Sequence, residues 1–223
     1  MKAKLLIQAC TKFIVGLLLA GLLLFLPAGT FRYWNAWLFI ATLFIPMFIA
    51  GIVMVFLSPH LLAKRLKAKE DEGAQKQVIA LSGLMFITGF IVAGLNFRFG
   101  WLAMPAWAVI AATVVFLLAY LLYAEVLREN AYLSRTVEVQ EGQKVVDTGV
   151  YGIVRHPMYS ATLLLFLSIP IILGSMISFV VFLLYPVLIV KRIRNEEEVL
   201  ERGLEGYSEY KQRVRYRLIP LVW

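Results

Sequence analysis

The chain has 223 residues, of which 61% are hydrophobic and only 16% are charged, and its mean hydropathy is +0.80. Soluble domains carry about 25% charged residues, so this composition excludes an ordinary soluble globule and a disordered chain. The net charge is +8. In a membrane protein such an excess is typical of basic residues that face the cytoplasm and anionic lipid, rather than of nucleic-acid binding.

Four stretches are long and apolar enough to cross a bilayer as single helices, because a span needs about 20 mostly apolar residues. They are 5–27, 33–57, 78–97 and 101–124. A fifth stretch, 158–190, has 33 residues without a charge. As one helix it would be about 50 Å long, too long for a hydrocarbon core about 30 Å thick. Gly174 and Ser175 lie at its middle, so we expect a hairpin of two short helices, bent further at Pro170 and Pro186.

The distribution of Lys and Arg supports these six helices and an all-α integral membrane protein in the cell inner membrane. If both termini are cytoplasmic, nearly all basic residues lie on the cytoplasmic side, and only Arg32 and Arg98 lie in the opposite connections. The cytoplasmic segments hold Lys64, Arg65, Lys67, Lys69 and Lys76, then Arg128, Arg135, Lys144 and Arg155, then eight basic residues from Lys191 onward. Four tryptophans would form an outer aromatic belt: Trp34, Trp37, Trp101 and Trp107.

The N-terminal stretch has an alternative interpretation as a cleaved signal peptide, with Lys2 and Lys4 before an apolar segment. The apolar segment is long for that role, and 27–29 is a poor cleavage site. We therefore interpret the chain as a bundle of four spans over 1–127, followed by a catalytic segment over 128–223. The lipid bilayer is the expected partner.

Several kinds of site are excluded. No G-x-G occurs, so both the dinucleotide fingerprint and the P-loop are absent. The single cysteine, Cys10, excludes an intramolecular disulfide, and His60 and His156 are too far apart for a local zinc motif. We expect neither a metal nor a nucleic-acid partner. The cytoplasmic segments are too short to fold alone, so a cofactor must bind between them and the membrane helices.

The segment 58–77 is interpreted as a solvated loop.

The segment 145–159 has the features of an anion-binding site at a membrane boundary. Gly149 and Gly152 permit turns, and Pro157 suits the first turn of the following helix. The free N–H groups and positive dipole of that helix start favour a carboxylate or phosphate, and Arg155 and His156 precede it directly. The alternative is that Arg155 and His156 only anchor a span among lipid headgroups.

The tail beyond 190 places charges of both signs at the membrane boundary. Arg192 and Glu196 are four residues apart and share a helical face, as do Glu198 and Arg202. This spacing also suits a plain surface helix stabilised by ion pairs. Gly203 and Gly206 then interrupt the helix, and Tyr207, Tyr210 and Tyr216 follow.

Three patterns together resemble the isoprenylcysteine carboxyl methyltransferase family. The first is Gly149-Val150-Tyr151 … Arg155-His156-Pro157-Met158-Tyr159, which is similar to a G-x-Y-x-x-x-R-H-P-x-Y signature; the second is Arg192-x-x-x-Glu196-Glu197-x-x-Leu200; the third is the ending 206–220. The resemblance covers 136–220. It implies a membrane methyltransferase that binds S-adenosylmethionine in a cytoplasm-facing pocket between the last hairpin, the loop before it and the C-terminal helix.

Carried over by position, the resemblance implies individual roles. Arg192 would face the substrate. Many relatives have His-x-Leu-Val where this chain has Gln143-Lys144-Val145-Val146. With Arg155 added from the boundary argument, the candidate cofactor residues are Gln143, Lys144, Val145, Val146, Tyr151, Arg155, His156, Pro157, Met158, Tyr159 and Glu196.

The acceptor is open at this point. A carboxylate needs only a cation such as Arg192 to position it, whereas a phospholipid amine or a thiol must lose a proton and needs a base, for which Glu197 or His156 is the candidate. Membrane sterol reductases, which bind NADPH, carry a similar R-H-P-N-Y element, although Met158 replaces its Asn here. A transporter or scaffold is the remaining alternative, but it would need ionisable residues near mid-span, and the spans contain only Lys12, close to one end.

Overall fold

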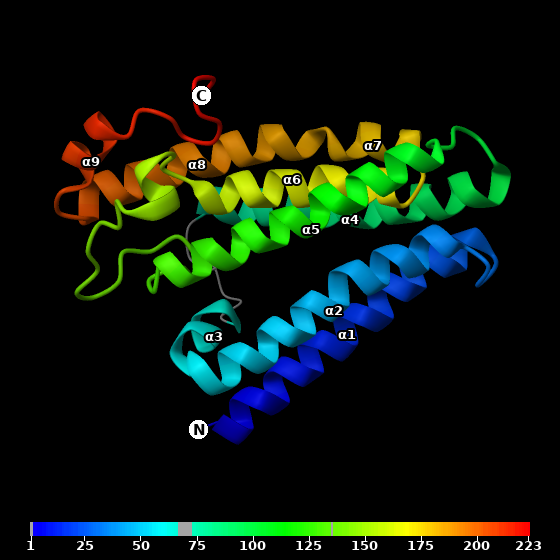
Figure 1. The fold of residues 1–223 in the computed structure, drawn as a ribbon, viewed down its shortest axis with the longest axis horizontal. Coiled ribbons are helices and arrows are strands. Elements are labelled where there is room, and N and C mark those ends of the chain that lie inside the picture. Colours follow the sequence, from blue (N-terminus) through cyan, green and yellow to red (C-terminus); the bar gives the residue numbers. More distant parts are fainter. Residues whose placement is uncertain (1, 67–72, 135) are drawn as a thin grey trace.

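The computed structural model describes residues 2–66, 73–134 and 136–223, and all regular secondary structure within them is helical (Figure 1). Lys67, Lys69, Glu70, Asp71, Glu72 and Arg135, which the sequence places in cytoplasmic loops, lie outside the described residues. The helices are α1 (Lys2–Ala28), α2 (Trp34–Leu57), α3 (Pro59–Leu66), α4 (Gly73–Phe99), α5 (Ala106–Glu129), α6 (Pro157–Ile172), α7 (Met176–Phe182), α8 (Leu184–Gly203) and α9 (Tyr207–Arg213), with a 3₁₀ turn η1 (Gly149–Gly152).

Within the described residues, five segments are long and apolar enough to cross a membrane: Leu5–Ala28, Trp34–Leu57, Gln75–Phe99, Ala106–Glu129 and Met176–Gly203. The sixth apolar helix, α6, is shorter, with 16 residues. The expectation of an all-α integral membrane protein is confirmed. The last of the five segments combines α7 with α8, and its charged residues begin at Lys191, so the polar end of α8 continues the helix beyond the apolar stretch.

The predicted hairpin turns where the sequence places it. Gly174 has φ +73°, a left-handed conformation that favours glycine. Ser175 then caps α7, because its hydroxyl oxygen accepts from the Ser178 N–H at 3.1 Å. The two prolines differ in effect. Pro170 lies inside α6, whereas the break between α7 and α8 falls at Leu183, three residues before Pro186. Pro186 has no N–H to donate to the carbonyl of Phe182, which accounts for an interruption there.

Small residues on α4 allow close helix packing. A Cβ on Gly94 would lie 2.6 Å from the carbonyl oxygen of Leu24 on α1, and one on Gly89 would lie 2.3 Å from the Phe182 ring on α7. Gly83, on the same helix, has no neighbour within 4 Å among the described atoms. The core beside this face is rich in phenylalanine. Phe86 contacts the rings of Phe166 and Phe182 at centroid distances of 4.8 and 5.3 Å.

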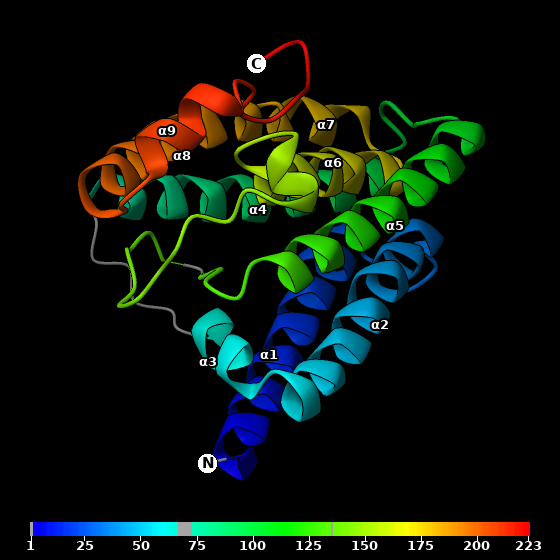
Figure 2. The same cartoon turned by 60° about the vertical axis from the view of Figure 1, so that its left-hand side comes forward.

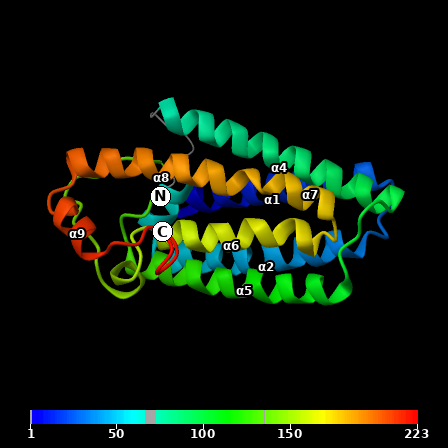
Figure 3. The ribbon, with the colours of Figure 1, turned by 90° about the horizontal axis from the view of Figure 1, so that it is seen from above.

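The two ends of the bundle differ in what they carry. Both chain termini lie toward the end that holds α9, as Figures 1 and 3 show together. The opposite end, the turn end, carries the connections 29–33, 100–105 and 173–175. All four belt tryptophans lie at the turn end, with about half or more of each exposed. The division of the chain at 127/128 stays a prediction, and α5 and α6, on either side of it, pack along each other.

The described parts of the segment 58–77, residues 58–66 and 73–77, are largely helical, in contrast to the expected solvated loop. They include α3, whose Leu62 is buried, and α4 already begins at Gly73. The α3 helix faces the loop that follows α5 (Figure 2). Lys64 Nζ donates to the carbonyl of Ala131 at 3.2 Å, and Arg65 Nη1 contacts the carbonyl of Ser134 at 3.5 Å. The helix is amphipathic, and its basic side chains hold this loop rather than extending only into solvent.

Candidate functional site

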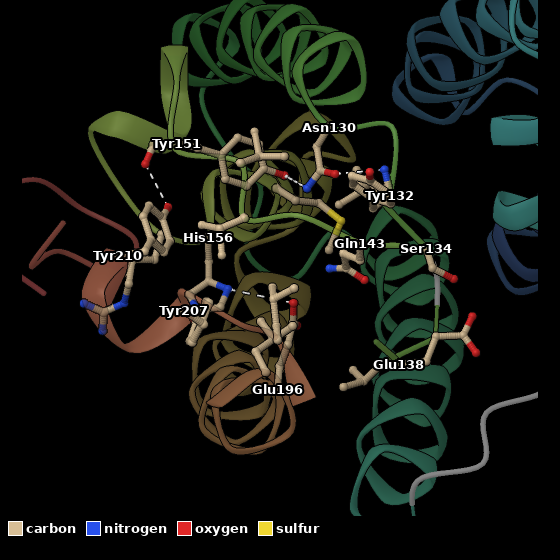
Figure 4. A pocket seen from close by; sticks show the side chains of 18 of the residues that line it. Asn130, Tyr132, Ser134, Glu138, Gln143, Tyr151, His156, Glu196, Tyr207 and Tyr210 are labelled. Atoms are coloured by element: carbon tan, nitrogen blue, oxygen red, sulfur yellow. Dashed lines mark hydrogen bonds and ion pairs between the residues drawn. The ribbon is translucent and has the colours of Figure 1, made fainter. Parts of the chain in front are cut away.

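A pocket opens at the end of the bundle that carries α9 (Figure 4). Its walls are the loop 130–146, the start of α6, one face of α8 and the tyrosines of α9. The empty space amounts to about 830 Å³, including the part that opens to solvent.

Most of the predicted site residues meet in this pocket. Its lining includes Gln143, Lys144, Val145, Val146, Tyr151, Arg155, His156, Met158, Tyr159, Arg192 and Glu196. Two predicted residues are absent from the lining. Pro157 is the first residue of α6, where it forms part of the helix start as the sequence indicates. Glu197 is buried behind the pocket, with 3% of its surface exposed.

The start of α6 is fixed by the C-terminal segment. The backbone N–H of Arg155 donates to the carbonyl of Tyr216, and that of His156 donates to the carbonyl of Arg217, both at 2.9 Å. One turn further along, the Ser160 hydroxyl donates to the carbonyl of Leu218 at 2.6 Å. The residues of the R-H-P motif are therefore held by backbone about 60 positions away in the chain.

A buried ion cluster lies behind the pocket. Glu197 Oε1 accepts from Arg155 Nε at 2.8 Å and is 3.1 Å from His156 Nε2, and Glu197 Oε2 accepts from Arg217 Nε at 2.9 Å. Arg155 Nη1 also donates to the carbonyls of Val214 and Arg215, at 2.8 and 3.0 Å. These interactions satisfy the buried charges and tie the polar end of α8 to the motif and to the tail.

This cluster changes the expectation for Glu197. A carboxylate that accepts from two guanidinium groups and lies beside an imidazole is held in its ionised form and is a weak proton acceptor. It also does not reach the pocket lining. The structure thus places Glu197 against Arg155 and His156, behind the pocket rather than in its lining.

Glu196 and Arg192, in contrast, both line the pocket and are linked through one tyrosine. Arg192 Nε donates to the Tyr159 hydroxyl oxygen at 2.8 Å, and the same hydroxyl donates to Glu196 Oε2. The guanidinium of Arg192 also lies over the Tyr159 ring, 5.8 Å from its centroid. His156 Nδ1 is 4.0 Å from Glu196 Oε1 (Figure 4). The predicted pair therefore lies on one wall of the pocket with opposite charges one helical turn apart.

The loop between α5 and α6 forms the opposite wall through its own hydrogen bonds. Asn130 Nδ2 donates to the Tyr151 hydroxyl oxygen at 3.0 Å (Figure 4). Burial raises the pKa of Tyr151 to about 12, although this bond from Asn130 opposes the shift, so the phenol stays protonated. Gln143 Oε1 accepts from the backbone N–H of Gln140 at 2.9 Å. The side chain of Gln143 thus shapes the loop with its oxygen and keeps its amide NH₂ for other contacts.

Sequence reasoning did not identify part of the lining. Asn130, Tyr132, Ser134, Thr136, Glu138, Tyr207 and Tyr210 belong to it. The loop residues follow no local motif, so nothing in their spacing indicated a site. The tyrosines were visible as an aromatic group in the tail, but only the fold brings them to the start of α6. Among the described residues, no three His, Cys, Asp or Glu side chains gather as metal ligands would.

Comparison with known proteins gives a match to one family model and matches to relatives that include two sterol reductases. The sequence model of the isoprenylcysteine carboxyl methyltransferase (ICMT) family matches residues 109–202. A Delta(14)-sterol reductase of Mus musculus is 33% identical over 91 residues, covering 40% of this chain and 22% of the relative. A Delta(14)-sterol reductase of Methylotuvimicrobium alcaliphilum is 22% identical over 135 residues, covering 54% of this chain and 32% of the relative. The matched part is therefore no more than a third of either reductase.

The family match includes the R-H-P-x-Y element, Arg192 and the Glu196-Glu197 pair, and these are the residues that the structure gathers in and behind the pocket. It begins within α5, ahead of the motifs that first indicated the resemblance. The match over residues 109–202 thus supports the resemblance to the isoprenylcysteine carboxyl methyltransferase family that the sequence motifs indicate.

Proposed function

We propose that the protein is a membrane-embedded methyltransferase that binds S-adenosylmethionine in the pocket between α6, α8, α9 and the loop 130–146. Its acceptor would be a lipophilic or membrane-associated molecule, and a carboxylate is favoured. The observation that carries the proposal is the wall formed by Arg192, Tyr159 and Glu196, where a cation and an anion line one pocket beside the family motif.

The chemistry of the lining fits such a cofactor. Glu196 offers acceptor oxygens for the ribose hydroxyls or for the ammonium of the methionine part. His156 and the start of α6 offer positive potential for its carboxylate. The rings of Tyr151 and Tyr159 offer faces for the adenine or for the sulfonium cation. These groups come from different elements and converge on one space (Figure 4).

The residues supply positioning rather than proton transfer. A carboxylate oxygen of the acceptor would form a bond to the methyl carbon of S-adenosylmethionine while the carbon–sulfur bond breaks and its electrons stay on sulfur, so no proton moves. The chain must therefore align the acceptor and exclude water. Arg192 suits the alignment because a guanidinium binds a carboxylate through two parallel hydrogen bonds.

An amine or a thiol acceptor is less well supported. Either would need a base, and Glu197 is engaged with Arg155, His156 and Arg217. His156 is likewise beside Glu197 through Nε2. With both candidate bases in the buried cluster, a substrate that arrives already ionised fits the pocket better.

A second candidate function is an NADPH-dependent membrane reductase. The matches to the two Delta(14)-sterol reductases favour it. The family match over 109–202 and the presence of Arg192, Glu196 and Glu197 support the methyltransferase instead. Tight NADPH binding without binding of S-adenosyl compounds would reverse this preference.

The pocket is lined by tyrosines of α9, and both termini lie toward the end of the bundle that holds α9 (Figures 1 and 3). The basic residues gather at that end, and we infer that it faces the cytoplasm of a cell whose inner membrane holds the protein.

Methyl transfer in membranes tests the proposal. Membranes that contain the protein, given S-adenosylmethionine with a tritiated methyl group, should label an organic-extractable product, and mild base should release the label because a methyl ester hydrolyses. The Arg192→Ala variant should lose most of this turnover and keep its affinity for S-adenosylhomocysteine within a few fold. Equal labelling by the parent and by Arg192→Ala would contradict the role of Arg192.

A further inference from the structure

The hydroxyl of Tyr207 is the unusual polar group of this site. Tyr207 is the first residue of α9, and Gly206 before it turns the chain with φ +81°. Its side chain is 4% exposed and packs in a small cluster with Leu204, Tyr210 and Val214. It also lines the pocket, close to His156 and Glu196 (Figure 4).

Among the described residues, the Tyr207 hydroxyl has no hydrogen-bond partner, although the oxygen is fully buried. The other tyrosines of the pocket all have one. Tyr151 accepts from Asn130, Tyr159 bonds with Arg192 and Glu196, and Tyr210 donates to the carbonyl of Tyr151 at 2.8 Å. A buried hydroxyl without a partner destabilises a fold, so each such group requires an explanation.

The protonation state of Tyr207 limits what its partner can be. Burial raises the pKa of Tyr207, and the negative charges of Glu197 and Glu196 raise it further. The group is therefore a neutral phenol that can donate one hydrogen bond and accept others. Glu196 beside it can only accept while it is ionised. Together they match a ligand hydroxyl, which can donate to Glu196 and accept from Tyr207.

We propose that the Tyr207 hydroxyl is a cofactor-binding group of this pocket and that it donates a hydrogen bond to a ribose hydroxyl of the S-adenosyl ligand. This inference rests on the proposed function. It adds a contact from α9, a helix that lies beyond the segment matched to the family. It also gives α9 a purpose in binding, in addition to packing against α8.

The Tyr207→Phe variant tests the inference because it removes one oxygen and keeps the ring in place. Without ligand, the variant should melt at the same temperature as the parent or a higher one, since it removes a buried group that has no partner. With ligand, it should bind S-adenosylhomocysteine about five- to tenfold more weakly, which is the size of one lost hydrogen bond. A hydroxyl with a purely structural role would not produce this opposite pair of effects.

The matched control is Tyr210→Phe, which removes the hydroxyl that bonds to the carbonyl of Tyr151. This variant should melt below the parent without ligand, and its ligand-free melting temperature should also be lower than that of Tyr207→Phe. Melting of the detergent-purified proteins and equilibrium dialysis with labelled S-adenosylhomocysteine give both readouts.

The outcomes separate the two proposals. If the parent binds S-adenosylhomocysteine and Tyr207→Phe binds it equally well, the role of Tyr207 is overturned and the proposed function stands. If Tyr207→Phe melts well below the parent without ligand, the hydroxyl has a structural partner and the inference is overturned as well. If the folded parent does not bind S-adenosylhomocysteine, the proposed function is contradicted, and the inference about Tyr207, which rests on it, is overturned with it.

Discussion

The two ends of the α6–α8 hairpin are closed by different chemistry. At the turn end, neutral groups bond to backbone: the Tyr33 hydroxyl donates to the carbonyl of Leu173 at 2.5 Å, and Asn35 Nδ2 donates to that of Ile172 at 2.9 Å. At the opposite end, which carries the pocket and α9 and is called the pocket end here, the buried charges of Arg155 and Glu197 hold the helices together. The same two helices are therefore joined by neutral hydrogen bonds at the turn end, where no ligand is expected. At the pocket end, where the proposed ligand binds, they are joined by buried ion pairs beside an open space.

The difference has a physical reason. A turn inside or near the bilayer must satisfy its carbonyls without water, and neutral donors do so without the cost of burying a charge. The pocket end must leave room for a polar ligand, so its supports lie behind the cavity rather than in it. A cluster of paired charges resists deformation only while every member is present, because a single remaining charge is left buried and unpaired.

The largest expected effect comes from breaking the ion cluster. Glu197→Gln keeps the shape of the side chain but leaves Arg155 and Arg217 without their anion, and it should lower the free energy of unfolding by about 3–5 kcal/mol. Thermal melting in detergent measures the loss. The matched control is Glu198→Gln on the exposed face of α8, which should cost less than about 0.5 kcal/mol. If the two variants melt alike, the cluster does not support the pocket end.

The next effect tests the packing near the turn end. Gly94→Ala places a methyl group 2.6 Å from the carbonyl of Leu24, which is backbone and cannot move aside, so we expect a loss of about 1–3 kcal/mol. Gly83→Ala on the same helix meets open space and should be neutral. The melting temperatures of the two variants measure this difference in stability. Affinity for S-adenosylhomocysteine should change in neither, and a change in Gly94→Ala would show that the two ends are coupled.

A smaller loss is expected at the turn itself. Tyr33→Phe removes the donor for the carbonyl of Leu173 and leaves that buried oxygen without this bond, at a cost of about 1–2 kcal/mol. Melting measures the cost. Ligand affinity should again equal that of the parent. A variant that kept its stability but bound ligand more weakly would reverse the contrast between the two ends.

The smallest effect is expected from α3. Arg65 Nη1 contacts the carbonyl of Ser134 at 3.5 Å and Met158 Sδ at 3.9 Å, and both residues line the pocket. Arg65→Met should weaken S-adenosylhomocysteine binding about two- to fivefold, because one wall loses a support worth about one hydrogen bond. Arg98→Met at the turn end is the control and should bind like the parent. Equal binding by both variants would limit α3 to a role in packing.

The sequence predicted the turn end well, because local rules decide it. A 33-residue apolar stretch is too long for one span, and Gly174-Ser175 is the residue pair that permits a turn at its middle. The contacts at the charged pocket end could be predicted only in part. The motif located Arg155, His156 and Tyr159, but not the pairing of Arg155 and His156 with backbone 216–217, because contacts between residues about 60 positions apart leave no periodic pattern.

Two assignments show where local reasoning stops. Glu196 and Glu197 are adjacent in sequence, and helical geometry separates them by about 100°. One therefore lines the pocket and the other joins the buried cluster, which only the arrangement of Arg155, Arg217 and α8 reveals. The segment 58–77 was expected to be solvated because it is rich in charge, yet Leu62 and the cation–π contact of Lys64 with Tyr132 dock α3 beside the site.

The most direct test of the account is a calorimetric titration of the folded, detergent-purified protein with S-adenosylhomocysteine and, separately, with NADPH. We expect saturable binding of S-adenosylhomocysteine, about tenfold weaker in Glu196→Gln because the acceptor loses its charge, and no saturable binding of NADPH. Saturable binding of NADPH, with none of S-adenosylhomocysteine, would contradict the account and assign the pocket to a reductase.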